Sequence, residues 1–418
     1  MPNAFYAQSG GVTAVINATA AGVIETARQY PDAIGTVFAG RNGVLGALEE
    51  ALYDTRQLSD HEIQALRRSP GAAFGSCRYR LADGPDGERE LQRLLDVFAA
   101  HDIRYVLYNG GGDSADTCLK IARLAQVRGL PLQAIHLPKT IDNDLPLTDC
   151  SPGFGSAAKY VATSVMEVGR DVDAMRRTAT RVFVLEVLGR HAGWTAAAAA
   201  LAASSRDDPP HLLLLPERPL CPERLIEQVH SCEQTYGFCV LVVSEGVRDL
   251  DGHLLSASQT QDAFGHPQLG GAGQQIATRI RQRLRLKTHV AVADYLMRSA
   301  AHHVSATDQA QAYAVGEAGI RAALAGASNI MISLERLSDQ PYAWRTGEAP
   351  LSQIANREKR LPDHYISDDG WHITTACRRY LQPLIVGESP PPYANGLPCY
   401  VKLRLQRAPC RLAPWPPR

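Results

Sequence analysis

The segment with the densest set of reactive groups covers residues 138–144 and reads PKTIDND. It places the ammonium group of Lys139, the hydroxyl of Thr140 and the carboxylates of Asp142 and Asp144 close together. In an extended or turn segment, side chains at positions i and i+2 can point to the same side. Phosphoryl transfer needs such a set, because a cation neutralises the moving group, one carboxylate accepts a proton and another positions Mg²⁺. The competing interpretation is a turn rich in Asp and Asn that caps a helix.

Two glycine-rich segments could hold a phosphate against the backbone. The sequence SGGVT covers residues 9–13, NGGGDSAD covers residues 109–116, and each leads into a helical pattern. Backbone N–H groups at the start of a helix bind anions, and glycine lets the backbone approach the ligand closely. Asp113 in the second segment also offers a metal ligand. Because these two segments accompany PKTIDND, we favour phosphate chemistry over a capping turn.

The second segment also fits the dinucleotide fingerprint, since Gly110, Gly112 and Ala115 have the required spacing. An NAD-dependent dehydrogenase would then place an acidic residue about 20 positions further on, at the end of the next strand. That strand instead ends in a segment containing Lys139, which suits a phosphate and not a ribose hydroxyl. The dehydrogenase interpretation is therefore disfavoured, and no Walker A pattern occurs in the chain.

The elements that must position these segments are short β-rich runs alternating with longer helical patterns. The runs cover residues 4–8, 105–109, 132–137, 181–187, 211–216 and 238–246. This alternation predicts parallel sheets, and ligands bind at the carboxyl ends of such strands. With 418 residues, we expect an α/β fold of two Rossmann-like domains, with mostly parallel sheets, helices on both faces and the active site in the cleft between them.

Composition excludes several functional classes. Lys plus Arg and Asp plus Glu both number 43, so the net charge is zero and gives no general reason to bind nucleic acid or a membrane surface. The nine scattered cysteines lack a C-x-x-C pair, which indicates reduced thiols and a cytoplasmic location. The N-terminus does not read as a signal peptide. The apolar run at residues 194–203 is too short to span a bilayer, and we predict a buried helix there.

The chain resembles the 6-phosphofructokinase family, and within it the pyrophosphate-dependent branch. The resemblance spans roughly residues 4–320 and rests on SGG (9–11), GSCR (75–78), GGGDS (110–114), PKTIDND (138–144), EVLGRHAGW (186–194), PE (216–217) and YLMR (295–298). The segments YISDDG (365–370) and PLIVGE (383–388) resemble the C-terminal extension of pyrophosphate-using members. The domains implied are residues 1–152 for the donor phosphate, 153–297 for the sugar phosphate, and 298–418 as a return segment and extension that packs on both.

The resemblance implies a role for each matching residue. The donor-phosphate site would consist of Gly11, Arg78, Gly112 and Ser114, and Asp113 would hold Mg²⁺. Asp142 would be the general base that takes the proton from the 1-hydroxyl of fructose 6-phosphate. The other catalytic residues would be Lys139, Thr140 and Asp144.

The sugar-phosphate site implied by the resemblance is larger. Its residues would be Arg181, Leu188, Gly189, Arg190, Glu217, Lys287, His289, Tyr295 and Arg298. Arg181 would reach into the sugar site of a neighbouring subunit, which implies a homodimer or homotetramer with shared sites. His191 follows this loop and is interpreted as a structural histidine.

The sequence departs from the family at three places. Tyr295 stands where many members have a histidine that contacts the sugar phosphate, and a phenol donates a hydrogen bond without a positive charge. His289 replaces an arginine that is usually contributed across the subunit boundary, with Lys287 nearby as a substitute. Ala21 and Glu25 occupy positions where allosteric bacterial members carry effector-binding arginines, so we expect no such regulation.

Two residues bear on the phosphoryl donor. Lys139 stands where common bacterial ATP enzymes have glycine, and Ser114 stands where glycine leaves space for the α-phosphate of ATP. Both favour pyrophosphate, so we expect a reversible, Mg²⁺-dependent phosphotransferase, with an ATP-dependent 6-phosphofructokinase as the alternative. A non-catalytic phosphate- or nucleotide-binding protein is disfavoured because Thr140, Asp142 and Asp144 are all present. The sequence leaves open whether other sugar phosphates such as sedoheptulose 7-phosphate are accepted, whether the oligomer is a dimer or a tetramer, and what the extension does.

Overall fold

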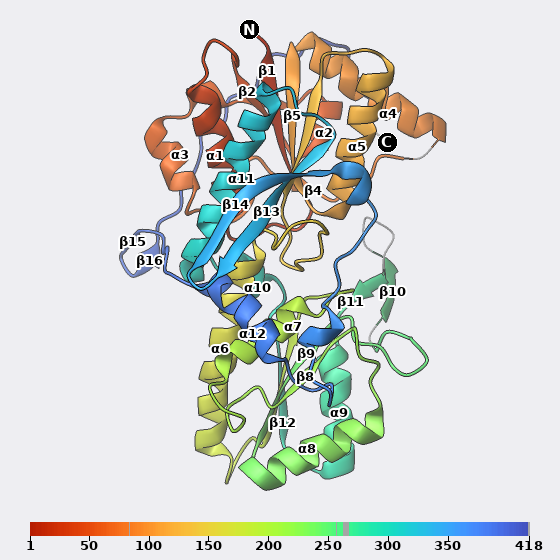
Figure 1. Cartoon of the computed structure of the whole chain (residues 1–418), viewed down its shortest axis with the longest axis vertical. Coiled ribbons are helices and arrows are strands. Elements are labelled where there is room, and N and C mark those ends of the chain that lie inside the picture. Colours follow the sequence, from red (N-terminus) through yellow and green to blue (C-terminus); the bar gives the residue numbers. More distant parts are fainter. Residues whose placement is uncertain (83, 256, 262–266, 417–418) are drawn as a thin grey trace.

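The computed structural model describes residues 1–82, 84–255, 257–261 and 267–416. These residues form two α/β bodies, which lie above and below one another in Figure 1. Each body has a central sheet flanked by helices, so the predicted fold class is confirmed.

The sheet of the upper body has eight strands. They run in the order β14-β13-β6-β5-β1-β2-β3, and β4 pairs with β1. Their bounds are β1 (Asn3–Ser9), β2 (Val37–Gly40), β3 (Leu52–Asp54), β4 (Ser76–Cys77), β5 (Ile103–Gly110), β6 (Gln133–Pro138), β13 (Ile330–Asp339) and β14 (Tyr342–Pro350). All pairings are parallel except β2 with β3 and β13 with β14 at the two edges. The central strands are buried along most of their length, as expected for a sheet with helices on both faces.

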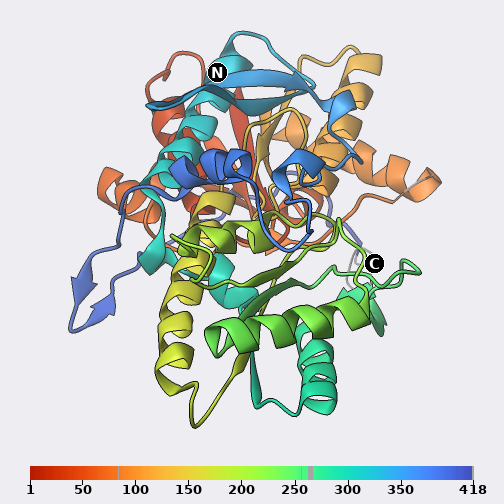
Figure 2. The same cartoon turned by 60° about the horizontal axis from the view of Figure 1, so that its bottom comes forward.

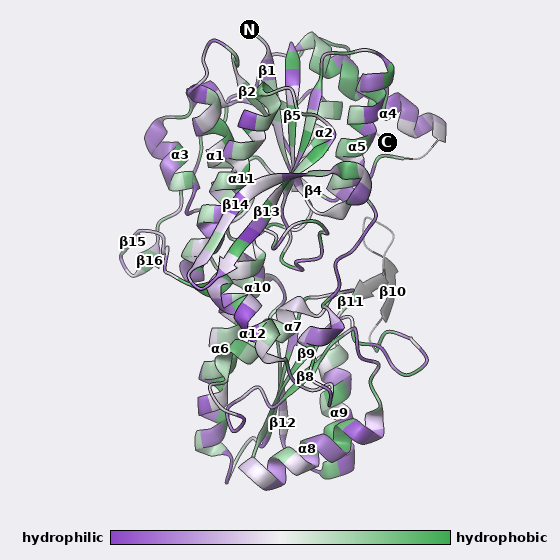
Figure 3. Ribbon diagram, viewed as in Figure 1, coloured by the Kyte–Doolittle hydropathy of each residue, from purple (hydrophilic) through white to green (hydrophobic). Residues whose placement is uncertain are grey.

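Helices cover both faces of this sheet. They are α1 (Ile16–Arg28), α2 (Val44–Leu48), α3 (Asp60–Leu66), α4 (Gly84–Ala100), α5 (Gly112–Val127) and α11 (Ala306–Leu324), with the 3-10 helix η1 (Thr55–Gln57). The start of α3 is fixed by a capping box, in which Ser59 and Glu62 satisfy each other's backbone N–H groups. Figure 3 shows hydrophilic colour on the outer helices α3 and α4, as solvent-facing helices require.

The sheet of the lower body has four parallel strands in the order β12-β7-β9-β8. Its strands are β7 (Val182–Val187), β8 (Leu212–Leu214), β9 (Cys239–Ser244) and β12 (Thr288–Val292). Its helices are α6 (Phe154–Met175), α7 (Trp194–Ala198), η2 (Ala199–Ala202), α8 (Pro222–Tyr236), α9 (Ala272–Leu284), α10 (Asp294–Ser299) and η3 (Ala301–His303). A hairpin of β10 (Ala257–Gln261) and β11 (Pro267–Leu269) lies beside them. The predicted buried helix at 194–203 is confirmed as α7 followed by η2.

The C-terminal part of the chain rejoins both bodies. After β14 come η4 (Leu351–Gln353), η5 (Asp363–Tyr365), α12 (Thr375–Leu381), η6 (Gln382–Ile385) and a hairpin of β15 (Tyr393–Ala394) and β16 (Leu397–Pro398). Figure 2 shows α12 across the junction of the two bodies and the hairpin projecting to one side. The predicted division at residues 152 and 297 stays a prediction.

Aromatic rings fill the junction. The ring of Trp194 lies 6.4 Å from that of Phe154, 6.0 Å from that of Tyr365 and 5.3 Å from that of Tyr380. These rings come from α6, α7, η5 and α12, so the C-terminal part of the chain shares a hydrophobic core with helices of the lower body.

Among the described residues, no helix combines the length and the hydrophobicity needed to cross a membrane. All nine cysteines lie within the described part of the chain, and none of them forms a disulfide there.

Candidate active site

A cavity of about 910 Å³ lies between the two bodies, at the carboxyl ends of strands from both sheets. Residues that directly follow β1, β5 and β6 line it from the upper body, and residues that follow β7 and β9 line it from the lower body. Thirteen of the predicted site residues lie in its wall: Gly11, Arg78, Gly112, Asp113, Ser114, Lys139, Thr140, Asp142, Asp144, Leu188, Arg190, Tyr295 and Arg298. The strand-end rule therefore located the cavity correctly.

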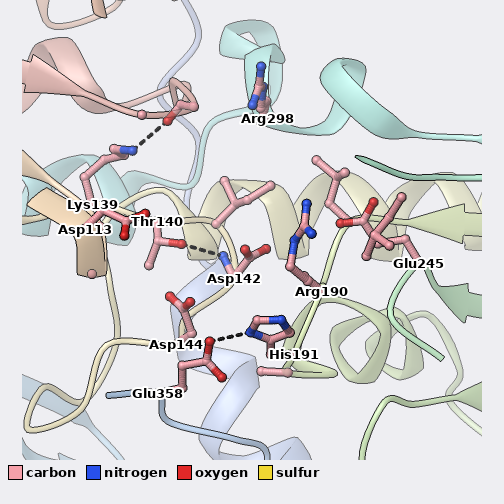
Figure 4. Close-up of a pocket in the computed structure, with 18 of the residues that line it drawn as sticks. Asp113, Lys139, Thr140, Asp142, Asp144, Arg190, His191, Glu245, Arg298 and Glu358 are labelled. Atoms are coloured by element: carbon pink, nitrogen blue, oxygen red, sulfur yellow. Dashed lines mark hydrogen bonds and ion pairs between the residues drawn. The ribbon is translucent and has the colours of Figure 1, made fainter. Parts of the chain in front are cut away.

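The loop after β1 meets the loop after β6 in this wall. The Nζ atom of Lys139 donates a 2.6 Å hydrogen bond to the carbonyl oxygen of Gly11 (Figure 4). Gly10 has a φ of +74°, a left-handed conformation that glycine adopts without strain. This turn brings the Gly11 backbone to the lysine and leaves the loop open towards the cavity.

The loop after β5 presents the start of a helix to the cavity. Helix α5 begins at Gly112, and a Cβ atom added to that residue would meet no other atom within 4 Å. A ligand can therefore approach these backbone N–H groups closely. Ser114 is buried. Its hydroxyl would lie only 2.0 Å from a Cβ atom on Gly110, so residue 110 must be glycine.

Positive charges converge near Gly11. A Cβ atom added to Gly11 would lie 2.4 Å from Nη1 of Arg298 and 3.8 Å from Nη2 of Arg78. Burial lowers the pKa of Lys139 to about 8, and the charges of Arg298 and Arg78 add to this effect. The guanidinium of Arg298 stacks on the ring of Tyr295, 3.6 Å from its centre. Such a cluster attracts a small, highly charged anion.

The carboxylates face this cluster from the 138–144 segment. The backbone N–H of Asp142 donates to the hydroxyl of Thr140 at 3.0 Å, which fixes the turn (Figure 4). Asn143, between the two carboxylates, has a φ of +52°. Among the described residues, Oδ1 of Asp142 and Oδ1 of Asp144 are buried without a hydrogen-bond donor. Buried polar atoms normally have a partner, so these two oxygens indicate a ligand site.

Burial raises the pKa of Asp142, and the neighbouring carboxylates of Asp144 and Glu245 raise it further. Burial also raises the pKa of Asp144. Lys139 and Arg190 oppose the shift of Asp142 without cancelling it. A carboxyl group poised in this way is a stronger base than an exposed one, which suits proton transfer.

The loop after β7 forms the wall opposite. Leu188 and Arg190 line the cavity, whereas Gly189 between them does not. Gly189 has a φ of +148°, its carbonyl accepts from the hydroxyl of Ser244, and a Cβ atom there would lie 2.8 Å from that hydroxyl. Gly189 therefore shapes the loop that directs Leu188 and Arg190 into the cavity.

Glu217 also lies outside the cavity wall. Both of its carboxylate oxygens accept from the backbone N–H of Gly193, at 3.0 and 3.2 Å, and one accepts from that of Leu361 at 3.0 Å. In this structure it braces the loop before α7, and sequence reasoning did not foresee that use of the carboxylate.

Three predicted sugar-site residues lie at the opposite end of the lower sheet from the cavity. Arg181 precedes β7 and pairs with Glu233 at 2.7 Å. Lys287 precedes β12, and His289 is an exposed residue near the start of that strand. They do not reach the cavity of their own chain, so their predicted role in a neighbouring subunit's site stays a prediction.

The structure adds residues that sequence reasoning missed. Glu245 directly follows β9 and lines the cavity, so the strand-end rule could have found it. His191 also lines the cavity, and its Nδ1 contacts a carboxylate oxygen of Glu358 (Figure 4), so the purely structural interpretation was incomplete. Asn356, Arg357 and Glu358 come from the C-terminal part of the chain and carried no recognisable signal.

Comparison with known proteins decides the family. Residues 3–323 match the family model described as Phosphofructokinase. The chain belongs to the phosphofructokinase family. Its resemblance to the pyrophosphate-dependent branch is confirmed by relatives of nearly equal length.

One relative of this phosphofructokinase is a Methylococcus capsulatus protein named pyrophosphate–fructose 6-phosphate 1-phosphotransferase, 56% identical over 411 residues and 98% of each chain. A Xanthomonas campestris protein of the same name is 50% identical over 415 residues and 99% of each chain. The solved structure of a Marinobacter aquaeolei pyrophosphate-dependent phosphofructokinase superposes with a TM-score of 0.91 at 52% identity, covering 99% of each chain.

Proposed function

We propose that this protein transfers a phosphoryl group from pyrophosphate to the 1-hydroxyl of fructose 6-phosphate, reversibly, giving fructose 1,6-bisphosphate and phosphate. The reaction links the two hexose phosphates of glycolysis and gluconeogenesis. Relatives named for this activity align over nearly the whole chain. The observation that carries the proposal is the cavity in which Lys139 and Arg298 converge on Gly11, facing Asp142.

Pyrophosphate suits the donor side for two reasons. Lys139 is buried beside the Gly11 backbone, so its charge supports a compact phosphoanhydride in a position that ATP enzymes of common bacterial type leave open. Ser114 adds bulk where the α-phosphate of ATP would need space, although it adds no negative charge. Backbone N–H groups at the start of α5 complete the phosphate-binding wall.

Asp142 is the proposed general base. In the forward direction its carboxylate accepts the proton of the sugar 1-hydroxyl as the oxygen attacks the terminal phosphorus. In the reverse direction the same carboxyl group returns the proton to the leaving sugar oxygen. Its raised pKa supports both steps, because the group is then close to balance between its two protonation states. Lys139 and Arg78 neutralise the transferred group, and phosphate remains as the leaving group.

The carboxylates near the donor loops fit Mg²⁺. Asp144 presents a buried oxygen that lacks a donor among the described residues, and Asp113 lies in the same wall. Mg²⁺ prefers carboxylate oxygens and substrate phosphates, so these residues would hold it. When bound, the ion would neutralise charge on the phosphoanhydride.

The sugar site is proposed to be shared between subunits. Arg190, Tyr295 and Arg298 line the cavity within one chain. Arg181, Lys287 and His289 lie at the far end of the lower sheet and would complete a neighbouring subunit's site in a homodimer or homotetramer. Gly189 and Glu217 would act by shaping the adjoining loops.

We also propose a cytoplasmic location and an absence of allosteric control. Free thiols persist in the reducing cytoplasm, and none of the described cysteines is paired. At the positions where effector-binding arginines occur in regulated members, Ala21 is buried and Glu25 accepts a hydrogen bond from Tyr313 at 2.6 Å.

The decisive experiment compares donors. Purified protein is given fructose 6-phosphate and Mg²⁺ with either pyrophosphate or ATP, and fructose 1,6-bisphosphate is measured. We expect turnover with pyrophosphate that stops on chelation of Mg²⁺, and formation of pyrophosphate when the products are supplied instead. A kcat/KM for ATP well above that for pyrophosphate would identify the alternative, an ATP-dependent 6-phosphofructokinase.

A further inference from the structure

The residue between the two carboxylates is held from outside its own loop. The side chain of Asn143 is fully buried, and its backbone keeps the left-handed conformation described above. Its Oδ1 accepts from the backbone N–H of Ser151 at 3.0 Å and from Nζ of Lys359 at 3.4 Å. Its Nδ2 donates to the hydroxyl of Tyr380 at 2.9 Å. Both polar ends of this amide are therefore fixed.

Lys359 makes an unusually complete set of contacts to this loop. Its ammonium group also donates to the carbonyl oxygens of Thr148 at 3.0 Å and Asp149 at 2.9 Å, so its three N–H bonds have three acceptors. Its backbone N–H donates to the carbonyl oxygen of Asp144 at 2.6 Å. Lys359 thus donates hydrogen bonds to four residues of the segment 143–149, which contains Asp144.

Tyr380 closes the loop from the other side. Its hydroxyl accepts from Asn143 and donates to the carbonyl oxygen of Asp149. Its ring packs against Trp194 and lies 5.6 Å from that of Tyr365, which fixes the direction of the hydroxyl. The indole N–H of Trp194 in turn donates to the carbonyl of Lys359 at 3.0 Å. Trp194 therefore restrains both Lys359 and Tyr380.

The segment that carries Lys359 is anchored to both bodies. Upstream, the amide of Asn356 donates to Asp116 in α5 at 3.1 Å. Downstream, the backbone N–H of Leu361 donates to Glu217 in the lower body. We call residues 356–361 the tether, because this short stretch contacts helix α5, the segment 143–149 and the lower body.

We infer that Lys359 and Tyr380 are positioning residues for the phosphoryl transfer: through Asn143 they fix the backbone that aims the carboxylates of Asp142 and Asp144 into the cavity. Neither side chain lines the cavity, so neither is expected to contact substrate. This gives the C-terminal extension a catalytic purpose, and it rests on the proposed function. A displacement of reacting groups by about 1 Å can lower a rate about 100-fold, so loss of either residue acts on turnover.

The test uses Lys359→Met, which keeps the length of the stem, and Tyr380→Phe, which keeps the ring. Matched controls are Lys402→Met and Tyr393→Phe, at exposed residues of the same extension. We expect kcat to fall roughly 10- to 100-fold in each test variant, while KM for both substrates changes little. Because both residues act through Asn143, the double variant should lose less than the product of the single losses. The controls should retain wild-type turnover.

Hydrogen exchange provides a readout that does not depend on activity. Amides of residues 141–151 should exchange faster in both test variants than in the wild type, and the controls should match the wild type. Unchanged exchange in this loop would overturn the inference, as would wild-type kcat in folded Lys359→Met and Tyr380→Phe proteins. Should the wild type use only ATP, the proposed donor would be wrong, and the same kcat comparison would be made with ATP.

Discussion

Nζ of Lys139 lies 2.6 Å from the carbonyl oxygen of Gly11, so two strand ends that are 128 residues apart in the chain meet at one point. The contact places a buried cation directly beside a glycine turn, with two guanidinium groups close by. We propose that the charge of the phosphoryl donor is neutralised at this point. The affinity for pyrophosphate is then expected to depend strongly on Lys139 of the PKTIDND segment.

Replacing Lys139 by methionine should raise KM for pyrophosphate by about 10- to 100-fold, because a charge-assisted contact is lost while the volume of the side chain is kept. KM for fructose 6-phosphate should change much less. Steady-state kinetics with each substrate varied in turn will measure both constants. Lys402→Met, at an exposed residue, is the control; an equal rise in both KM values would place Lys139 elsewhere in the mechanism.

Asp142→Asn should reduce kcat by about 10²- to 10⁴-fold, since the amide cannot accept the proton of the sugar hydroxyl. Binding of fructose 6-phosphate should be nearly intact, because the change is isosteric. Turnover and calorimetric titration of the variant would separate the two effects. A loss of less than about tenfold would contradict the assignment of the general base.

Gly11→Ala should disturb both substrates at once. The added Cβ atom would lie 2.4 Å from Nη1 of Arg298, so the guanidinium must move although the backbone is not strained. We expect KM for fructose 6-phosphate and for pyrophosphate to rise by roughly tenfold, with little change in the melting temperature. Kinetics and thermal unfolding of the same preparation test this; wild-type KM values would show that Arg298 is not needed at that position.

His211 should make the lower body sensitive to acid. Burial lowers the pKa of this histidine to about 4, and its Nδ1 accepts from the backbone N–H of Val240, which requires a neutral ring. The folded pKa is therefore below the unfolded value of about 6.5. Its contribution to the free energy of unfolding is complete above that value and is lost as the pH falls towards 4.

His211→Asn keeps an acceptor for Val240 and removes the titrating ring. The difference in the free energy of unfolding between wild type and variant should shrink by about 2 kcal/mol from pH 7.5 to pH 4.5, following the shift in pKa. Urea unfolding at both pH values measures it. A difference that stays constant with pH would mean that the ring titrates normally in the folded protein.

Sequence reasoning succeeded where function depends on a strand end. Lys139 directly follows β6, and Gly112 and Asp142 lie within four residues of the end of a parallel strand, so their local pattern already places them at the edge where ligands bind. The β-rich runs were equally predictable, because burial on both faces gives continuous apolar sequences.

Other contributions could not be predicted because they depend on long-range packing. Lys359 and Glu358 lie in a stretch without periodicity or glycine signals, and their contacts arise from the path that the chain takes after β14. Glu217 looks like a ligand-binding acid in sequence, but nearby backbone N–H groups take up its oxygens. The role of Glu217 becomes visible only in the folded chain, where the backbone N–H groups of Gly193 and Leu361 lie next to its carboxylate.

Both sheets are complete at Pro350, and the PKTIDND motif lies well before it. A shorter product ending there would keep every motif from SGG (9–11) to YLMR (295–298) and still lack the tether from Asn356 to Leu361. If Lys359 positions the carboxylates as we infer, possession of the motif alone does not make a chain active. A search for active members should ask whether an equivalent of Lys359 is encoded near the end of the gene.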